Sequence, residues 1–175
     1  DLKTNISSVW LNKVSGAVTF AGSTQITQLR TDGSAAYNLS FTGASNSIAS
    51  FYTATPFETT GVLTLGDEAT DSFTYSGGNF APSSPSSIRI AGSVITSNVS
   101  NGVITLGDAN TAVVLTADTT INSSASNSNI NLASSAAIAG TGKALTLNAG
   151  TGTVSITNVL SGMGNLSFIG NEISW

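Results

Sequence analysis

Apolar and polar residues alternate in short runs along most of this chain. In the segment 62–65, Val62 and Thr64 face one side of a predicted strand while Leu63 and Leu65 face the other. A period of two predicts β-strands, and strands that begin roughly 10 to 25 residues apart leave no room for helical crossovers. We therefore expect an all-β fold in which helices are rare. The same apolar pairs recur at Val18/Phe20, Leu39/Phe41, Ile88/Ile90, Ile130/Leu132, Leu145/Leu147, Val154/Ile156 and Leu166/Phe168.

One longer stretch occurs twice. GVLTLGDEAT occupies residues 61–70 and returns as GVITLGDANT at 102–111, an offset of 41 residues. Each copy predicts a strand that ends at a Gly-Asp turn. Self-similarity at a spacing of roughly 20 to 50 residues is typical of solenoids, propellers and stacked arrays. The interval spans either two coils of one solenoid or two strands of packed sheets.

The small side chains favour a narrow, stacked architecture. Ala, Val and Ile fit columns in which equivalent residues lie above one another at the strand spacing of about 4.8 Å. Asn residues near predicted turns adopt left-handed conformations or stack in ladders, and turn formation is the favoured interpretation; they are Asn110, Asn127, Asn129, Asn148 and Asn158. The sequence therefore predicts a right-handed parallel β-helix, a form of β-solenoid. The alternative is a β-sandwich with strand exchange between subunits.

The chain divides into two parts. Residues 1–36 differ from the rest and are predicted to form an N-terminal cap or joining segment, whereas residues 37–175 carry the β-strand repeats. Within the repeats, residues 77–87 contain Pro82 and Pro85 and predict a loop boundary, because Pro removes donors from a strand ladder. The C-terminal apolar residues have no polar cap, which predicts an open end that meets neighbouring repeats or another subunit.

Composition narrows the class of protein. With 40% hydrophobic and only 8% charged residues, the chain has the apolar content that a folded core needs. Ser, Thr and Asn make up about two residues in five, as is typical of extracellular β-repeat proteins. The net charge of -4 argues against a nucleic-acid partner, and no apolar run approaches the roughly 20 residues of a membrane span. We expect an extracellular or cell-surface protein.

The side chains that carry most enzyme chemistry are missing. The sequence has no His and no Cys, which excludes His-based triads, thiol nucleophiles and the usual zinc sites. Asp67, Glu68 and Asp71 form the densest acidic cluster, and such clusters serve as general acids, general bases or calcium ligands. However, Asp108 takes the position of Asp67 in the second decapeptide, where Ala and Asn replace its acidic neighbours. We therefore interpret these residues as turn formers, with calcium a weaker alternative and no predicted catalytic residue, metal or cofactor.

Aromatic residues are concentrated in the first half of the chain. They could stack on sugars, but core or cap packing is the favoured interpretation, because aromatic side chains stabilise a fold most when they are buried. The residues concerned are Trp10, Tyr37, Tyr52, Phe57, Tyr75 and Phe80.

Four segments of the chain carry a resemblance to a known family. GVLTLGDEATDSFTYSGG, SSIRIAGSVIT, GVITLGDANTAVVLTA and KALTLNAGTGTVSI resemble the β-strand-repeat regions of very large bacterial surface proteins of the filamentous-haemagglutinin-like or autotransporter-like kind. The resemblance covers most of residues 37–170. It implies secretion and a structural or adhesive role.

These observations predict a non-enzymatic extracellular module of a bacterial surface protein, acting as stalk, surface layer or adhesin. One alternative is a self-assembling filament subunit joined by strand complementation. Another is a carbohydrate-binding or carbohydrate-active β-helix that uses Asp67, Glu68 and Asp71. The expected partners are copies of the chain or neighbouring repeats, and a host surface or glycan.

Overall fold

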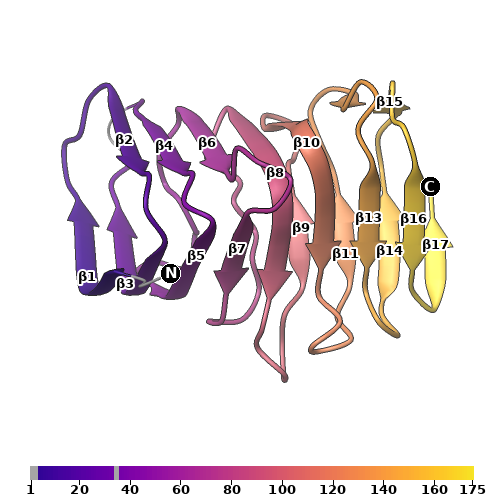
Figure 1. Ribbon diagram of the computed structural model, residues 1–175, viewed down its shortest axis with the longest axis horizontal. Helices are drawn as coiled ribbons and strands as arrows, with labels where there is room; N and C mark the ends of the chain where they lie inside the picture. The colour runs from indigo at the N-terminus through magenta and orange to yellow at the C-terminus, as the bar shows by residue number, and fades with distance from the viewer. Residues whose placement is uncertain (1–3, 34–35) are drawn as a thin grey trace.

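The computed structural model describes residues 4–33 and 36–175, and this part of the chain contains β-strands and no helix. Its strand pairs are parallel and stack as a β-solenoid of about 7 turns. Figure 1 shows the stack from the side, with β1 near one end and β16 and β17 at the other. The predicted all-β fold and solenoid architecture are confirmed, and the β-sandwich alternative is wrong.

The strands form three parallel ladders, which define three faces of the solenoid. The first face consists of β1 (Thr4–Leu11), β3 (Thr24–Thr31), β5 (Ser45–Phe51), β7 (Ser72–Tyr75), the second halves of β8 (Ser87–Thr96) and β10 (Ala112–Asn122), β13 (Leu145–Asn148) and β16 (Leu166–Ile169). The second face consists of β2 (Ala17–Phe20), β4 (Asn38–Phe41), β6 (Val62–Leu65), the first halves of β8 and β10, β12 (Ile138–Ala139) and β15 (Leu160–Ser161). The third face consists of β9 (Ile104–Leu106), β11 (Ile130–Leu132), β14 (Thr153–Ile156) and β17 (Glu172–Ser174).

The third face is regular only in the second half of the chain. It begins with Phe80, which forms an isolated parallel bridge to Ile104. In the preceding turn, the chain between β5 and β6 is irregular and places the buried Phe57 in the core with a φ of +56°. The cross-section therefore changes along the stack from two ladders and a loop to three ladders.

The decapeptide repeat does not correspond to a whole number of turns. Paired residues in adjacent turns lie between 19 and 27 positions apart. Leu63 of the first copy pairs with Ile88 on the second face, whereas Ile104 of the second copy pairs with Ile130 on the third face. The 41-residue interval thus covers one turn and two further faces. Both interpretations of the interval, two whole coils or two strands of packed sheets, are wrong.

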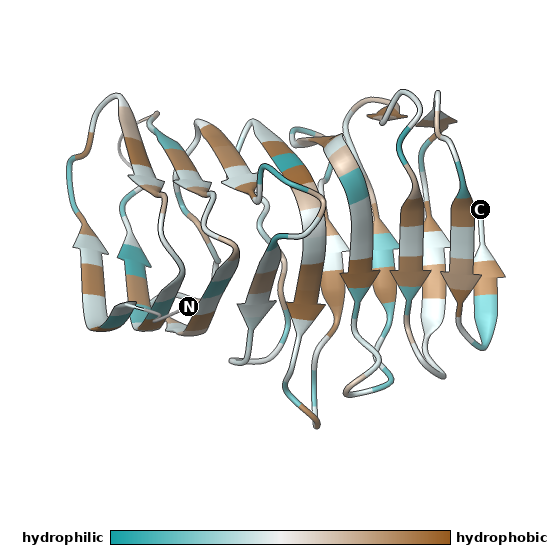
Figure 2. Cartoon of the chain, in the orientation of Figure 1, coloured by the Kyte–Doolittle hydropathy of each residue, from teal (hydrophilic) through white to brown (hydrophobic). Residues whose placement is uncertain are grey.

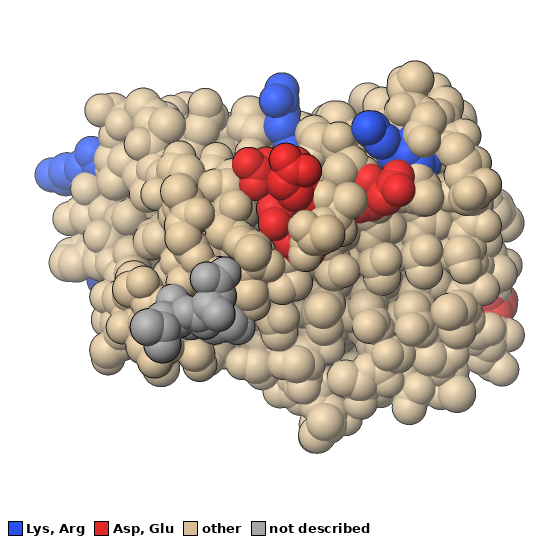
Figure 3. Space-filling model, viewed as in Figure 1, with Lys and Arg blue, Asp and Glu red and all other residues tan. Residues whose placement is uncertain are grey.

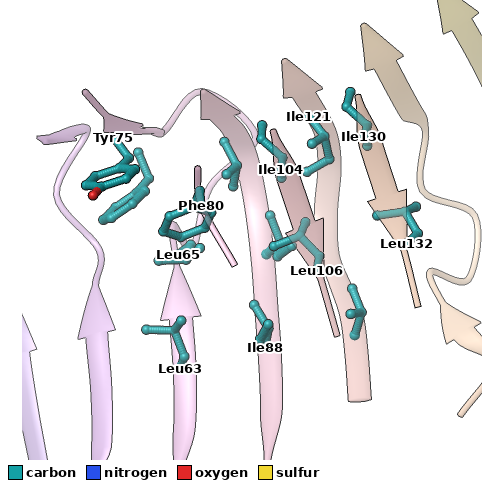
Figure 4. Packing of buried hydrophobic residues seen from close by; sticks show 14 of the residues in the cluster. Leu63, Leu65, Tyr75, Phe80, Ile88, Ile104, Leu106, Ile121, Ile130 and Leu132 are labelled. Carbon is teal, nitrogen blue, oxygen red and sulfur yellow. The ribbon is translucent and has the colours of Figure 1, made fainter. Parts of the chain in front are cut away.

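The core lies between the faces, and the alternating residues fill it as predicted. Leu63 and Leu65 are fully buried, while Val62 and Thr64 are partly exposed. Figure 2 shows hydrophobic bands that continue from strand to strand, and Figure 4 shows the buried side chains pointing inward from neighbouring strands. The buried aromatic rings, from Tyr37 to Phe80, lie in the first half of the core together with aliphatic side chains, and the buried hydrophobic residues from Ile88 onward are aliphatic.

The N-terminal strands belong to the same stack. β1 pairs with β3 along seven residue pairs, and β2 pairs with β4. Of the predicted cap at 1–36, residues 1–3 and 34–35 lie outside the described residues. The predicted loop boundary at 77–87 falls on an irregular connection from β7 to β8, which ends where β8 begins at Ser87, and Pro82 and Pro85 are buried. Both β6 and β7 pair with β8, so the ladders continue past this loop.

Asparagine side chains link the corners of successive turns. Asn38, Asn127 and Asn129 each accept a hydrogen bond through Oδ1 from a backbone N–H 24 residues later, at distances of 2.9 to 3.1 Å. The side-chain carbonyl therefore extends the backbone ladder by one bond at a corner, where the main chain turns away. Of the five Asn residues considered in the sequence, Asn127 has a left-handed conformation, with a φ of +51°, whereas Asn110, Asn129, Asn148 and Asn158 do not.

Candidate functional site

The two Gly-Asp corners share the same backbone turn. Gly66 follows β6 with a φ of +78°, and Gly107 follows β9 with a φ of +76°. A Cβ atom at Gly66 would lie 2.3 Å from the carbonyl oxygen of Ala91 in the next turn, so the corner accepts no side chain there. The predicted turn is therefore present in both copies, although they lie on different faces.

Different carboxylates stabilise the two corners. Asp71, which is 5% exposed, accepts hydrogen bonds through Oδ2 from the backbone N–H groups of Asp67 and Glu68, at 2.9 and 3.0 Å. In the second copy, Asp108 accepts through Oδ1 from the N–H groups of Asn110 and Thr111, at 2.7 and 2.9 Å. Both carboxylates thus accept two backbone N–H bonds at their corner, but the donors to Asp108 correspond to Ala69 and Thr70 of the first copy and the donors to Asp71 are Asp67 and Glu68.

The first corner carries a local excess of negative charge. Partial loss of hydration raises the pKa of Asp67 above its ordinary value of 3.8, and a hydrogen bond to the Asp71 carboxyl, the charge of Asp71 and the charge of Glu68 raise it further. Figure 3 shows acidic side chains gathered in the upper middle of one face, with a basic side chain directly above them and a second group of charged side chains to the right. The described residues contain no group of three or more acidic side chains arranged to hold a metal ion. The calcium candidates Asp67, Glu68, Asp71 and Asp108 therefore form no shared ligand set.

Replacing Asp71 with Ala should destabilise the corner by about 1–2 kcal/mol, because two backbone donors lose their protein acceptor. The measurement is the free energy of unfolding in urea. Asp71→Asn is the matched control, since its amide oxygen can still accept both bonds, and it should lose less than half as much. An equal loss in both variants would show that the charge matters and the hydrogen bonds do not.

Replacing Asp67 with Asn should stabilise the protein at pH 7 and leave it unchanged at about pH 3. A raised pKa means that the folded state holds the Asp67 proton more tightly than the unfolded chain, so stability falls as pH rises from 3.8 through the folded-state pKa. The variant lacks this titration, and its side-chain NH₂ can donate to Asp71 at every pH. Because Asp67 is exposed, we expect a small gain. Urea midpoints at the two pH values measure it; a gain that persists at low pH would contradict the argument.

The aromatic residues separate into two groups. Four of the six singled out in the sequence are buried in the core, as predicted: Tyr37, Phe57, Tyr75 and Phe80. Trp10 and Tyr52 are instead 57% and 59% exposed, which contradicts core packing for these two. They lie on either side of Arg30, whose guanidinium carbon is 4.5 Å from the centroid of each ring.

The sequence analysis did not predict that Arg30 lies between the rings of Trp10 and Tyr52. The signal was present in the spacing, since residues 10, 30 and 52 are separated by 20 and 22 positions and the β1–β3 and β3–β5 registers have the same steps. That spacing has no meaning until the turn length is known.

The last turn presents core positions to solvent. Leu166 pairs with the buried Leu145, and Ile173 pairs with the buried Val154, yet they are 42% and 41% exposed. A hollow of about 570 Å³ lies beside them, lined in part by Val159, Leu166 and Trp175. This end of the solenoid therefore carries an apolar surface.

These features define the chain as a parallel β-solenoid with carboxylate-stabilised corners and an apolar final turn. Comparison with protein-family models, curated proteins and solved structures gave no match. A search of the described residues found no helix with the length and apolar character of a membrane span.

Proposed function

We propose that the chain is a non-enzymatic, extracellular structural module of a bacterial surface protein, which serves as a stalk, a surface layer or the shaft of an adhesin. The observation that carries this proposal is the first-face ladder, which runs without interruption from β1 to β16. A stack of about 7 turns at about 4.8 Å each is a stiff body about 35 Å long.

The direction of the hydrogen bonds supports a load-bearing role. In a parallel solenoid, the bonds between adjacent strands run along the stack, and each turn contacts only its neighbours. Tension along the axis is therefore shared among the bonds of two ladders in the first turns and of three ladders in the second half. The corner bonds from Asn38, Asn127 and Asn129 to the following turn add to the same set.

The surface chemistry supports a position outside the cell. The chain relies on Ser, Thr and Asn for its polar surface and has 8% charged residues, so changes in pH and salt alter few interactions. The densest group of acidic side chains lies at a corner of the solenoid, where Asp71 accepts hydrogen bonds from the backbone. The resemblance to bacterial surface repeats points the same way.

Antibody labelling of intact source cells tests the proposal. Antibodies raised against the purified chain should label unpermeabilised cells, and mild protease treatment of intact cells should remove the signal. A cytoplasmic protein of the same cells serves as the control that must stay unlabelled. Labelling that appears only after permeabilisation would overturn the proposal.

The exposed apolar residues of β16 and β17 favour a second candidate function, self-assembly into filaments. The first turn of a second copy would pair with the exposed edges of β15, β16 and β17 and cover Leu166 and Ile173. Negative-stain microscopy should then show filaments, and Ile173→Asp should abolish them. Val99→Asp, at a loop residue that is 77% exposed, is the matched control. Filaments unchanged by Ile173→Asp would contradict this candidate.

A further inference from the structure

We propose that the hollow beside Trp10 and Arg30 binds a sugar ring of a neutral polysaccharide. The hollow has a volume of about 510 Å³ and is lined by both residues together with Asn12, Asp32, Thr53 and Glu58. The site goes beyond the structural role proposed above and does not depend on it.

The parallel register places the three central side chains in one column. Trp10 and Arg30 are direct partners in the β1–β3 ladder. Tyr52 follows in the next turn, where its backbone N–H donates to the carbonyl of Leu29 at 3.0 Å. The guanidinium is therefore held between two rings, at 4.5 Å from each centroid. Cation–π contact on both faces fixes its plane before a ligand arrives.

The edge of the Arg30 guanidinium is available to a ligand. Within the part of the chain that the structure describes, the side chain of Arg30 has the two ring contacts and no hydrogen bond or ion pair. A guanidinium has five N–H donors, all of which point outward in its plane. Because the rings cover the faces and leave the edge open, these donors can bind the oxygen atoms of a neighbouring molecule.

The floor of the hollow is held by its own hydrogen bonds. The backbone N–H of Glu58 donates to Thr31 Oγ1 at 2.8 Å, and the N–H of Lys13 donates to Asp32 Oδ2 at 3.3 Å. A Cβ atom at Gly33 would lie 3.0 Å from the carbonyl oxygen of Glu58, so the two segments are in close contact. A site whose supporting groups are already ordered loses little entropy on binding.

The charges around the hollow select a neutral ligand with many hydroxyl groups. Asp32 and Glu58 outnumber Arg30, so the hollow disfavours an anion, and its mixture of acceptors and donors suits a ligand that carries both kinds of hydrogen-bonding group. A sugar ring satisfies all three, since its hydroxyl groups donate to carboxylates and accept from a guanidinium and from the Asn12 amide. The apolar C–H face of the same ring can lie against Trp10, whose indole is more than half exposed.

Affinity electrophoresis tests the proposal with the whole chain. Native gels containing dextran, xyloglucan, galactomannan or β-glucan are compared with gels containing alginate or heparin. At least one neutral polysaccharide should retard the protein. Trp10→Ala should weaken that retardation about tenfold or more, as is usual for an aromatic anchor. Trp175→Ala is the matched control, because Trp175 is 72% exposed in the last turn, and it should bind as the native chain does.

Tryptophan fluorescence provides a second readout. Trp10 and Trp175 are the two tryptophans of the sequence, so in Trp175→Phe the emission reports Trp10 alone. The retarding polysaccharide should shift that emission to shorter wavelength. No retardation in any neutral gel, retardation in the acidic gels only, or equal retardation of Trp10→Ala and the native chain would each overturn the site. The cellular location of the protein, which tests the structural role, is measured separately.

Discussion

Replacing Gly92 with Ala should prevent the native stack from forming or destabilise it by several kcal/mol. Gly92 joins the two halves of β8, where the chain passes from the second face to the first, and its φ is +71°. A Cβ atom there would lie 2.2 Å from the carbonyl oxygen of Asp71. That oxygen cannot withdraw, because it accepts the Ser93 N–H bond at 2.8 Å. The clash therefore adds to the roughly 1–2 kcal/mol that an L-residue loses in a left-handed conformation.

Gly142→Ala is the matched control for this experiment. Gly142 has nearly the same conformation, with a φ of +70°, but no heavy atom lies within 4 Å of its added Cβ. The Gly142→Ala variant should lose only the roughly 1–2 kcal/mol of stability that an L-residue loses in a left-handed conformation. Soluble yield, the β-sheet circular dichroism signal and the urea midpoint measure both variants. If they unfold at the same urea concentration, the close contact with Asp71 does not stabilise the fold as described.

Replacing Phe41 with Ala should destabilise the first half of the stack by about 3–5 kcal/mol, the usual range for a buried Phe. Phe41 is 1% exposed, and its ring centroid lies 4.9 Å from that of Phe20, 5.4 Å from Phe73 and 5.9 Å from Phe57. Removing the ring leaves a cavity in a core whose other members come from three different turns. The side chains around it cannot all close the gap.

Hydrogen exchange shows where this loss occurs. Because each turn of a solenoid contacts only its neighbours, protection should fall in β2, β4 and β6, while β13 and β14 keep theirs. Phe41→Leu, which fills most of the space, should show the same pattern with a smaller loss. Equal loss of protection along the whole chain would mean that the stack unfolds as a single cooperative unit.

The inward and outward faces of the strands could be predicted from sequence, because alternation is a local property. Leu63 and Leu65 are buried for the same reason that Val62 and Thr64 are not. Phe57 shows the limit of this reasoning. It lies in an irregular segment with no alternation, and its burial was predicted from its aromatic ring instead.

The number of residues in each turn of the solenoid could not be predicted, because no short segment of the sequence determines it. The step between paired residues varies from 19 to 27 and is determined by the loops, whose lengths tolerate change. The near-identical decapeptides suggested a period, yet they form the same strand and corner on different faces. What repeats is a unit smaller than one turn.

The candidate ligand site depends on the winding in the same way. Trp10, Arg30 and Tyr52 lie far apart in sequence, and only the β1–β3–β5 register brings them into one column. By contrast, the role of the acidic corner was accessible, since comparison of Asp67 with Asp108 pointed to turn formation. That Asp71 stabilises the first corner and Asp108 the second was not accessible, because it depends on the direction in which each side chain points.

The placement of the decapeptides on different faces bears on how the gene can change. Recombination between the two copies would delete 41 residues and join the first Gly-Asp corner directly to the first half of β10. That strand would take the place of β7, and every later strand would move by one face. Loss of 25 residues, the step from Leu63 to its partner Ile88, would instead leave the ladders in register. Copy number in such a gene should therefore vary in whole turns, even where the most similar stretches of coding sequence lie elsewhere.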